Sequence, residues 1–204
     1  GAATAFANGG VGPYFYNWSH GPTGASLDTL AAGIYTVVIL DQNGCLDTTD
    51  ITISEPTLLT STAVQVSAVN CFNGNDGSAT VSPTGGTMPY AYAWGNGETA
   101  DTATNLSVGT NYITITDVNG CSYIDSVVIN QPSAPIVTSN TILNNVLCNA
   151  DTSALAAASA VGGTSPYAFT WSNGANTDTA SFSAGTWYVT ITDANGCFEL
   201  DSII

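Results

Sequence analysis

The feature that most constrains this chain is a seven-residue segment that returns at a fixed interval. It reads ILDQNGC at 39–45, ITDVNGC at 115–121 and ITDANGC at 191–197, with starting points 76 residues apart each time. Self-similarity at a fixed period indicates a tandem array of one structural unit. The chain is therefore predicted to contain three copies of the same fold.

Two further segments follow the same period. One reads GGVGPYFYNW, GGTMPYAYAW and GGTSPYAFTW, and the other reads GIYTVVILD, GTNYITITD and GTWYVTITD. The first two copies close at Glu55-Pro56 and Gln131-Pro132. We predict domains at 1–56, 57–132 and 133–204, and we expect the first to be truncated at its N-terminus and the third at its C-terminus.

The hydrophobic pattern within a copy has period two. In YITITD, Ile113 and Ile115 share one face, and Thr114 and Thr116 share the other. One buried and one wet face are typical of antiparallel sheets, and Asn-Gly, which ends every such strand, is a strong hairpin signal. Short strands separated by turns predict an all-β fold, a tandem array of immunoglobulin-like antiparallel β-sandwich repeats.

Two aromatic features of the copies support this fold. A Trp ends the Gly-Gly segment of each copy, and we expect it at equivalent core positions, since burying such a ring removes much apolar surface from water: Trp18, Trp94 and Trp171. Gly33 to Tyr35 resembles the tyrosine corner of immunoglobulin-like folds. The other copies have Asn111 and Trp187 in place of this Tyr.

Composition excludes several functions. The chain has 15 acidic residues, one His and no Lys or Arg. Binding to nucleic acids or to anionic membranes needs these cations, and no apolar run reaches the ~18 residues of a membrane span. We expect neither nucleic-acid partners nor membrane insertion.

Catalysis is not expected either. The single His, His20, follows Ser19 in a loop and has no counterpart in the other copies. Paired carboxylates can hydrolyse glycosides, but the recurring acids Asp41, Asp117 and Asp193 each begin a turn, where Asp caps its own backbone. We therefore predict that the chain is not an enzyme.

The cysteines also follow the repeat. Cys71 and Cys148 each lie 14 residues before a Gly-Gly pair, so the equivalent of the first copy would precede residue 1 and pair with Cys45. We predict the disulfides Cys71–Cys121 and Cys148–Cys197, each worth about 4 kcal/mol in the chain-entropy model. Pairing across the linkers, Cys45–Cys71 and Cys121–Cys148, and buried free thiols are the alternatives.

Taken together, the motifs resemble a known family. Gly-Gly-Thr-x-Pro-Tyr, Ser-Asn-Gly, Ala-Gly-Thr and Asp-x-Asn-Gly-Cys, with CFNGNDGSATVSPTGG at 71–86, look like the SprB repeat. This repeat builds surface adhesins of gliding bacteria of the Bacteroidota. The resemblance implies gliding motility, an outer-surface location reached by type IX secretion, and a stalk or adhesive role without catalytic residues.

No cofactor is expected, and calcium is the alternative. An acidic, cation-free stalk can use Ca²⁺, which binds several oxygen ligands. Asn73, Asn75 and Asp76 form one oxygen-rich loop, of which the third copy keeps Asn149 and Asp151.

Asp is followed by Ser or Thr more often than composition suggests. Asp-Ser or Asp-Thr before an apolar residue or Thr resembles the general O-glycosylation signal of the Bacteroidota, although Asp-Thr also suits turns and strand starts. The candidate sites are Thr29, Thr48, Thr102, Ser126, Thr179 and Ser202.

These observations predict an extracellular structural stalk or filament segment of a large repetitive surface protein. Its expected partners are neighbouring repeats of the same chain, with lateral self-association or surface glycans beside them. The alternative is a glycan- or ligand-binding module that uses exposed aromatic side chains.

Overall fold

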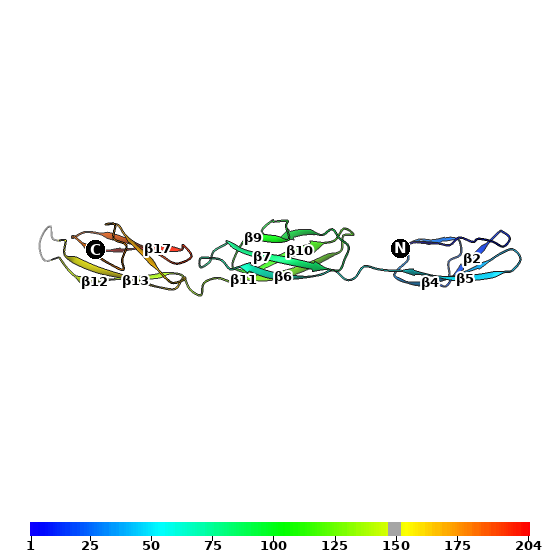
Figure 1. Cartoon of the computed structure of the whole chain (residues 1–204), viewed down its shortest axis with the longest axis horizontal. Coiled ribbons are helices and arrows are strands. Elements are labelled where there is room, and N and C mark those ends of the chain that lie inside the picture. Colours follow the sequence, from blue (N-terminus) through cyan, green and yellow to red (C-terminus); the bar gives the residue numbers. More distant parts are fainter. Residues whose placement is uncertain (147–151) are drawn as a thin grey trace. The chain divides into compact units, whose positions relative to one another are not determined.

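The computed structural model describes residues 1–146 and 152–204 (Figure 1), and within these ranges it contains strands and no helix. Accordingly, no helix among the described residues is long and apolar enough to cross a membrane. The chain divides into two compact units, Gly1–Leu58 and Leu59–Ile204. The first predicted domain matches the first unit to within two residues, and the other two predicted domains share the second unit.

The middle repeat is a sandwich of two antiparallel three-stranded sheets, ordered β6-β7-β9 and β11-β10-β8. The register of the longest pair runs from Gly109 opposite Ile129 to Thr116 opposite Ser122. Its strands are β6 (Thr60–Ser67), β7 (Gly77–Thr84), β8 (Ala91–Trp94), β9 (Thr102–Leu106), β10 (Gly109–Thr116) and β11 (Ser122–Ile129).

The third repeat has the same topology, with sheets ordered β12-β13-β15 and β14-β16-β17. Its strands are β12 (Val137–Asn144), β13 (Ala154–Val161), β14 (Ala168–Trp171), β15 (Thr179–Phe182), β16 (Trp187–Thr192) and β17 (Phe198–Ile203).

The first unit keeps the same plan in its β2-β4-β5 sheet, which faces the short β1-β3 pair. Its strands are β1 (Ala3–Thr4), β2 (Phe15–Trp18), β3 (Ser26–Leu27), β4 (Gly33–Leu40) and β5 (Leu46–Ile53). The predicted all-β array of immunoglobulin-like sandwiches is confirmed.

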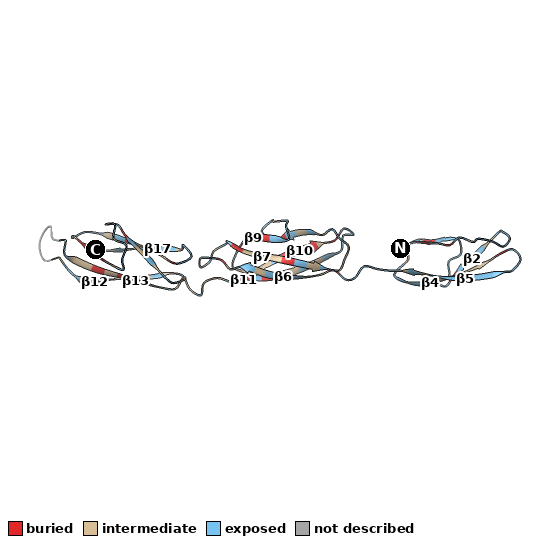
Figure 2. Cartoon of the chain, in the orientation of Figure 1, coloured by how far each residue is buried: buried red, intermediate tan, exposed pale blue. Residues whose placement is uncertain are grey.

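Each repeat has its own hydrophobic core. In the middle repeat, Ile113 and Ile115 of β10 are buried, whereas Tyr112 of the same strand is exposed. The predicted alternation of buried and exposed residues is therefore present. Figure 2 shows the buried positions on β7, β9 and β10 inside this sandwich.

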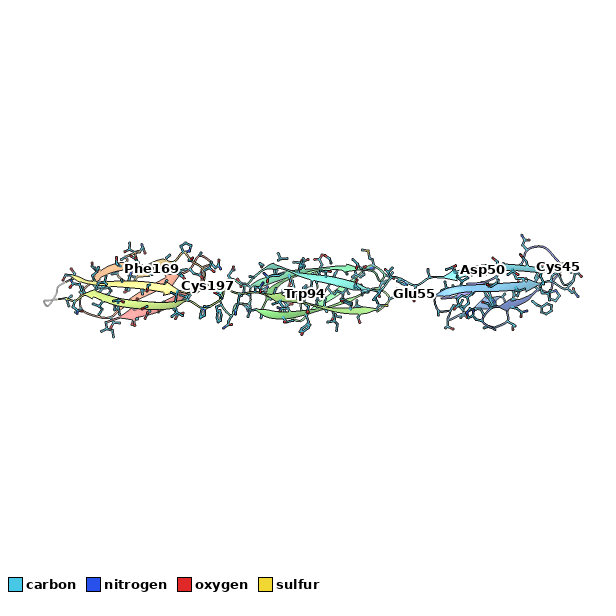
Figure 3. The ribbon with its side chains drawn as sticks, turned by 90° about the horizontal axis from the view of Figure 1, so that it is seen from below. Cys45, Asp50, Glu55, Trp94, Phe169 and Cys197 are labelled. Atoms are coloured by element: carbon cyan, nitrogen blue, oxygen red, sulfur yellow. A yellow bond between two sulfur atoms is a disulfide. The ribbon has the colours of Figure 1, made fainter. Side chains whose placement is uncertain are left out.

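The Trp that ends the Gly-Gly segment lies in the core of every repeat. Trp18, Trp94 and Trp171 are only 4%, 4% and 2% exposed, and Figure 3 shows Trp94 between the strands of the middle sandwich. Each indole N–H donates to the backbone carbonyl six residues later, at 2.8 to 2.9 Å. The ring is therefore buried without leaving its polar atom unpaired.

The tyrosine corner is present in all three repeats with three different side chains. The Tyr35 hydroxyl donates to the Ala31 carbonyl, four residues earlier, at 3.2 Å. Asn111 Nδ2 and Trp187 Nε1 donate to the carbonyl at the same offset, at 2.8 and 3.0 Å. The corner thus requires a donor at this position rather than a phenol.

Candidate functional site

The Asp-x-Asn-Gly-Cys turn is built around a buried carboxylate. In the middle repeat, Asp117 Oδ1 accepts the N–H groups of Asn119 and Cys121, both at 2.9 Å. Its Oδ2 accepts the N–H of Thr87, just after the Gly-Gly pair, at 2.9 Å. Asp41 and Asp193 make the equivalent three bonds. The predicted backbone-capping role of these residues is confirmed, and each ties the cysteine turn to the Gly-Gly loop.

These hydrogen bonds favour the charged form of the carboxylates. At Asp41, the backbone N–H of Cys45 has the largest effect, and with those of Val11 and Asn43 it lowers the pKa despite the opposing effect of burial. At Asp117, burial is the largest effect and raises the pKa, but the N–H groups of Cys121, Thr87 and Asn119 outweigh it, and the pKa is lowered. Both groups therefore act as acceptors at neutral pH.

The Gly-Gly loop of the third repeat lies against the linker that enters it. The Gly163 N–H donates to the Ala134 carbonyl at 2.9 Å. Gly162 has a φ of 79°, and a Cβ there would collide with the Pro135 carbonyl. Only Gly combines this left-handed conformation with so close an approach of two backbones.

The two cysteines of the middle repeat lie at opposite ends of its sandwich. The Val69 N–H donates to the Asn130 carbonyl at 3.0 Å, so the loop that carries Cys71 lies at the end of β11. Cys121 lies directly before the start of β11. Eight residues of strand separate these ends by roughly 25 Å, whereas disulfide Cα atoms lie about 6 Å apart. The predicted Cys71–Cys121 disulfide is therefore wrong.

Cys71 is instead bonded to Cys197 of the third repeat, with the Cα atoms 5.6 Å apart. The predicted Cys148–Cys197 pair is excluded because Cys197 is already bonded, and the alternative Cys45–Cys71 is excluded because Cys71 is. Cys45 and Cys121 are free and exposed, and Cys148 lies outside the described residues. Figure 3 shows Cys45 at the end of the first sandwich away from Glu55, where the cysteine turn of that repeat lies.

Polar contacts surround the disulfide and make a junction between consecutive repeats. Asn195 Nδ2 donates to the Asn70 carbonyl and to Thr164 Oγ1, both at 3.1 Å. The Asn73 N–H donates to Gln131 Oε1 of the linker at 2.7 Å. The role of these Asn and Gln residues at the junction was missed at the sequence level, although the recurrence of Asn two residues before each turn cysteine was a visible signal.

The loop considered for calcium uses its carboxylate internally. Asp76 Oδ1 accepts the Asn70 N–H at 2.9 Å, and its Oδ2 accepts Asn70 Nδ2 at 2.5 Å. Asn149 and Asp151 lie outside the described residues. No group of three or more His, Cys, Asp or Glu in 1–146 and 152–204 is arranged to hold a metal ion.

The Ser19-His20 pair has a structural explanation. Ser19 Oγ lies 2.9 Å from His20 Nδ1 and also accepts the Thr36 N–H at 3.2 Å. Ser172 Oγ accepts the Tyr188 N–H at 3.1 Å in the third repeat, where Asn173 takes the place of His20. The serine is thus a recurring strand contact.

The candidate O-glycosylation residues occupy two kinds of environment. Thr29, Thr48, Thr102, Ser126 and Ser202 are exposed, whereas Thr179 is half-buried. In three of the pairs, formed with Asp47, Asp125 and Asp201, the carboxylate accepts the N–H of the next residue at 2.7 to 2.8 Å. The Asp of these pairs therefore has a local backbone-capping role.

Solved structures similar to this chain include immunoglobulin domains and a repeat of an adhesion protein. The first eight Ig domains of Down syndrome cell adhesion molecule isoform 1.30.30 are 14% identical over 98% of this chain, with a TM-score of 0.42. This chain spans 33% of that structure. Extracellular domains 3–5 of Drosophila OTK are 12% identical over 93% of this chain and 83% of theirs, with a TM-score of 0.28.

The third structure is a tetra-tandem repeat from the extending region of a large adhesion protein. It is 14% identical over 95% of this chain and 66% of its own length, with a TM-score of 0.24. With all three TM-scores below 0.5, no conclusion rests on these likenesses. The comparison with curated proteins found no match.

The family comparison agrees with the motifs. Residues 63–99 and 140–176 match the family model of the SprB repeat, and the two segments cover the same part of the middle and third sandwiches. The resemblance inferred from the sequence is confirmed for these two segments, which are similar to the SprB repeat.

Proposed function

We propose that this chain is a non-catalytic stalk segment of an extracellular, adhesin-like surface protein. The SprB match supports the assignment as a repeat protein of the adhesin type. The disulfide supports an extracellular location, because disulfides persist in oxidising compartments. The stalk role rests on one observation: consecutive repeats are joined end to end by the Cys71–Cys197 bond.

This bond changes the path of tension along the second unit. When the chain is pulled from its ends, the force crosses from Cys71 to Cys197 through sulfur and bypasses the segment between them. That segment spans a separation of 126 residues. Unfolding of either sandwich can then lengthen the chain only through residues outside the disulfide loop. A segment of this kind keeps its length under load.

Single-molecule stretching of the whole 204-residue chain, held at both termini, tests the role. In oxidising buffer we expect no extension from residues 72–196. With reductant, or in Cys197→Ser, unfolding of the second unit should release roughly 400 Å more, at about 3.4 Å per residue. Equal contour lengths with and without reductant would contradict the stalk role. Cys45→Ser is the control and should behave as the parent chain.

The position of the aromatic rings favours the stalk over the glycan-binding alternative. The three recurring Trp rings are buried and cannot stack on sugars. Exposed rings recur singly, as Tyr112 and Tyr188 one strand position after the corner residue.

The finer assignments are proposals that rest on the family resemblance. They are a role in gliding motility, export by the type IX route, O-glycosylation at the exposed Asp-Ser and Asp-Thr pairs, and contacts with neighbouring repeats, with laterally associated chains or with surface glycans. Glycans on exposed hydroxyls would shield sheet edges from pairing with other chains.

A further inference from the structure

The turn that ends at Cys121 is built like the turn that ends at Cys197, but its thiol is free and exposed. In both turns, an Asp Oδ1 accepts the N–H of the cysteine at 2.9 Å, and an Asp Oδ2 accepts the N–H of the Thr that follows Gly-Gly at 2.9 Å. The third repeat uses this turn to bind the loop around Cys71.

We propose that the Cys121 turn is a docking site for a cysteine-bearing loop of another copy of this repeat, a loop like residues 69–77, and forms a disulfide with it. Among the described residues, Cys71 is already bonded and Cys45 is another turn cysteine. Cys148, the loop cysteine of the third repeat, lies outside them. The occupant is therefore a loop of this kind on another repeat, of the same polypeptide or of a second one.

A side-chain amide beside Cys121 is oriented to receive such a loop. At the Cys197 junction, Asn195 Nδ2 donates one hydrogen to Thr164 Oγ1 and the other to the Asn70 carbonyl of the docked loop. Asn119 Nδ2 donates to Thr87 Oγ1 in the same way, at 2.9 Å. An amide has two such hydrogens, so the second is directed to where the carbonyl of a docked loop would lie.

The Cys45 turn provides a natural comparison. Val11 stands where the other repeats have Thr87 and Thr164. Val has no hydroxyl to hold the side-chain amide of Asn43. The thiol is present at this turn, but the side chain that orients the amide is missing.

The bond forms by thiol–disulfide exchange. The oxidant is a disulfide, either of an oxidoreductase or of a small molecule. The Cys121 thiol and the loop thiol each lose a proton, an S–S bond forms between their sulfurs, and the oxidant takes up two electrons and two protons to become two thiols. This inference does not depend on the stalk role, since a cross-link without a mechanical effect would leave it standing.

A disulfide map of the full protein from its native host tests the proposal. Free thiols are alkylated in denaturant before reduction, and the protein is digested with chymotrypsin and an Asp-specific protease, since the chain has no Lys or Arg for trypsin. We expect Cys121 to escape alkylation and to be linked to a loop cysteine, either Cys148 or its counterpart in another repeat. Alkylation of Cys121 before reduction, or its linkage to Cys45 or to a small thiol, would overturn the proposal.

Two further measurements identify the source of the loop and the role of the amide. On non-reducing gels, a loop of the same polypeptide leaves a monomer, whereas a second chain gives multimers that reductant dissolves. Asn119→Asp keeps the thiol but loses the donor, and should lower the rate of cross-linking at Cys121 about three- to tenfold. The Cys71–Cys197 bond is the internal reference, and Asn43→Asp is the matched control. An unchanged rate in Asn119→Asp would contradict docking through the amide.

Discussion

Cys71 and Cys197 are 126 residues apart in sequence and have Cα atoms 5.6 Å apart, in two different sandwiches. The disulfide therefore does not close a single domain, as disulfides of small secreted domains commonly do. It fixes the end of one repeat to the cysteine turn of the next.

Loss of this bond should destabilise the second unit. The chain-entropy model gives about 5 kcal/mol for a loop of this length when both repeats unfold. Cys197→Ser should therefore shift the urea midpoint of the second unit downward, measured by Trp fluorescence without reductant. Cys121→Ser removes an exposed free thiol and should leave the midpoint unchanged. If reductant leaves the urea midpoint of the parent chain unchanged, this expectation is wrong.

The Trp cores should be sensitive to truncation. Trp94→Ala should lower the free energy of unfolding of the middle repeat by about 3–5 kcal/mol, because a cavity replaces a buried ring and the Ala100 carbonyl loses its donor. Tyr112→Ala, on the exposed face of the same sheet, should cost far less. Chemical denaturation followed by circular dichroism measures the free energy of unfolding of both variants. Equal losses of free energy in the two variants would contradict the core role of Trp94.

Acid should weaken the cysteine turns. The pKa values of Asp41 and Asp117 are lowered in the folded state, so their contribution is complete above the unfolded value of about 4 and is lost as pH falls through the folded values. We expect the melting temperature to decrease when the pH is lowered below about 4. Asp117→Asn should melt lower at pH 7 and show a smaller change between pH 6 and pH 2. Asp101→Asn, at an exposed site, is the control, and a pH profile of Asp117→Asn parallel to the parent would contradict this.

Glycosylation should distinguish equivalent positions. Thr102 and Thr179 follow Asp at the same place in their repeats, but Thr102 is exposed and Thr179 is half-buried. If the Asp-Thr pairs are used, peptides from protein made in the native host should carry more glycan on Thr102 than on Thr179. Mass spectrometry of intact glycopeptides measures the occupancy, and unmodified peptides at both positions and at Thr29 would exclude the modification.

The sequence predicted what depends on local alternation. Ile113 and Ile115 are buried where period two placed them. Turn chemistry also predicted the capping role of Asp117, since the carboxylate, the N–H groups and the cysteine all lie within five residues.

The disulfide was not predicted correctly because alternation fixes the face of a strand and not the end of the sandwich. Cys71 precedes β7 and the Gly-Gly loop follows it, so one whole strand separates them. The Gly-Gly loop contacts the Asp117 turn. That contact, which joins segments 30 residues apart, places Cys121 far from Cys71 and is a tertiary property.

The bond between Cys71 and Cys197 also imposes an order on folding and oxidation. In an unfolded chain, Cys121 is 50 residues from Cys71 and Cys197 is 126 residues away, so loop closure would favour joining Cys71 to Cys121. The middle sandwich prevents this once folded, because it holds those two sulfurs at its opposite ends. Folding of a repeat must therefore precede oxidation of its cysteines, and the folded sandwich determines which cysteines can be joined.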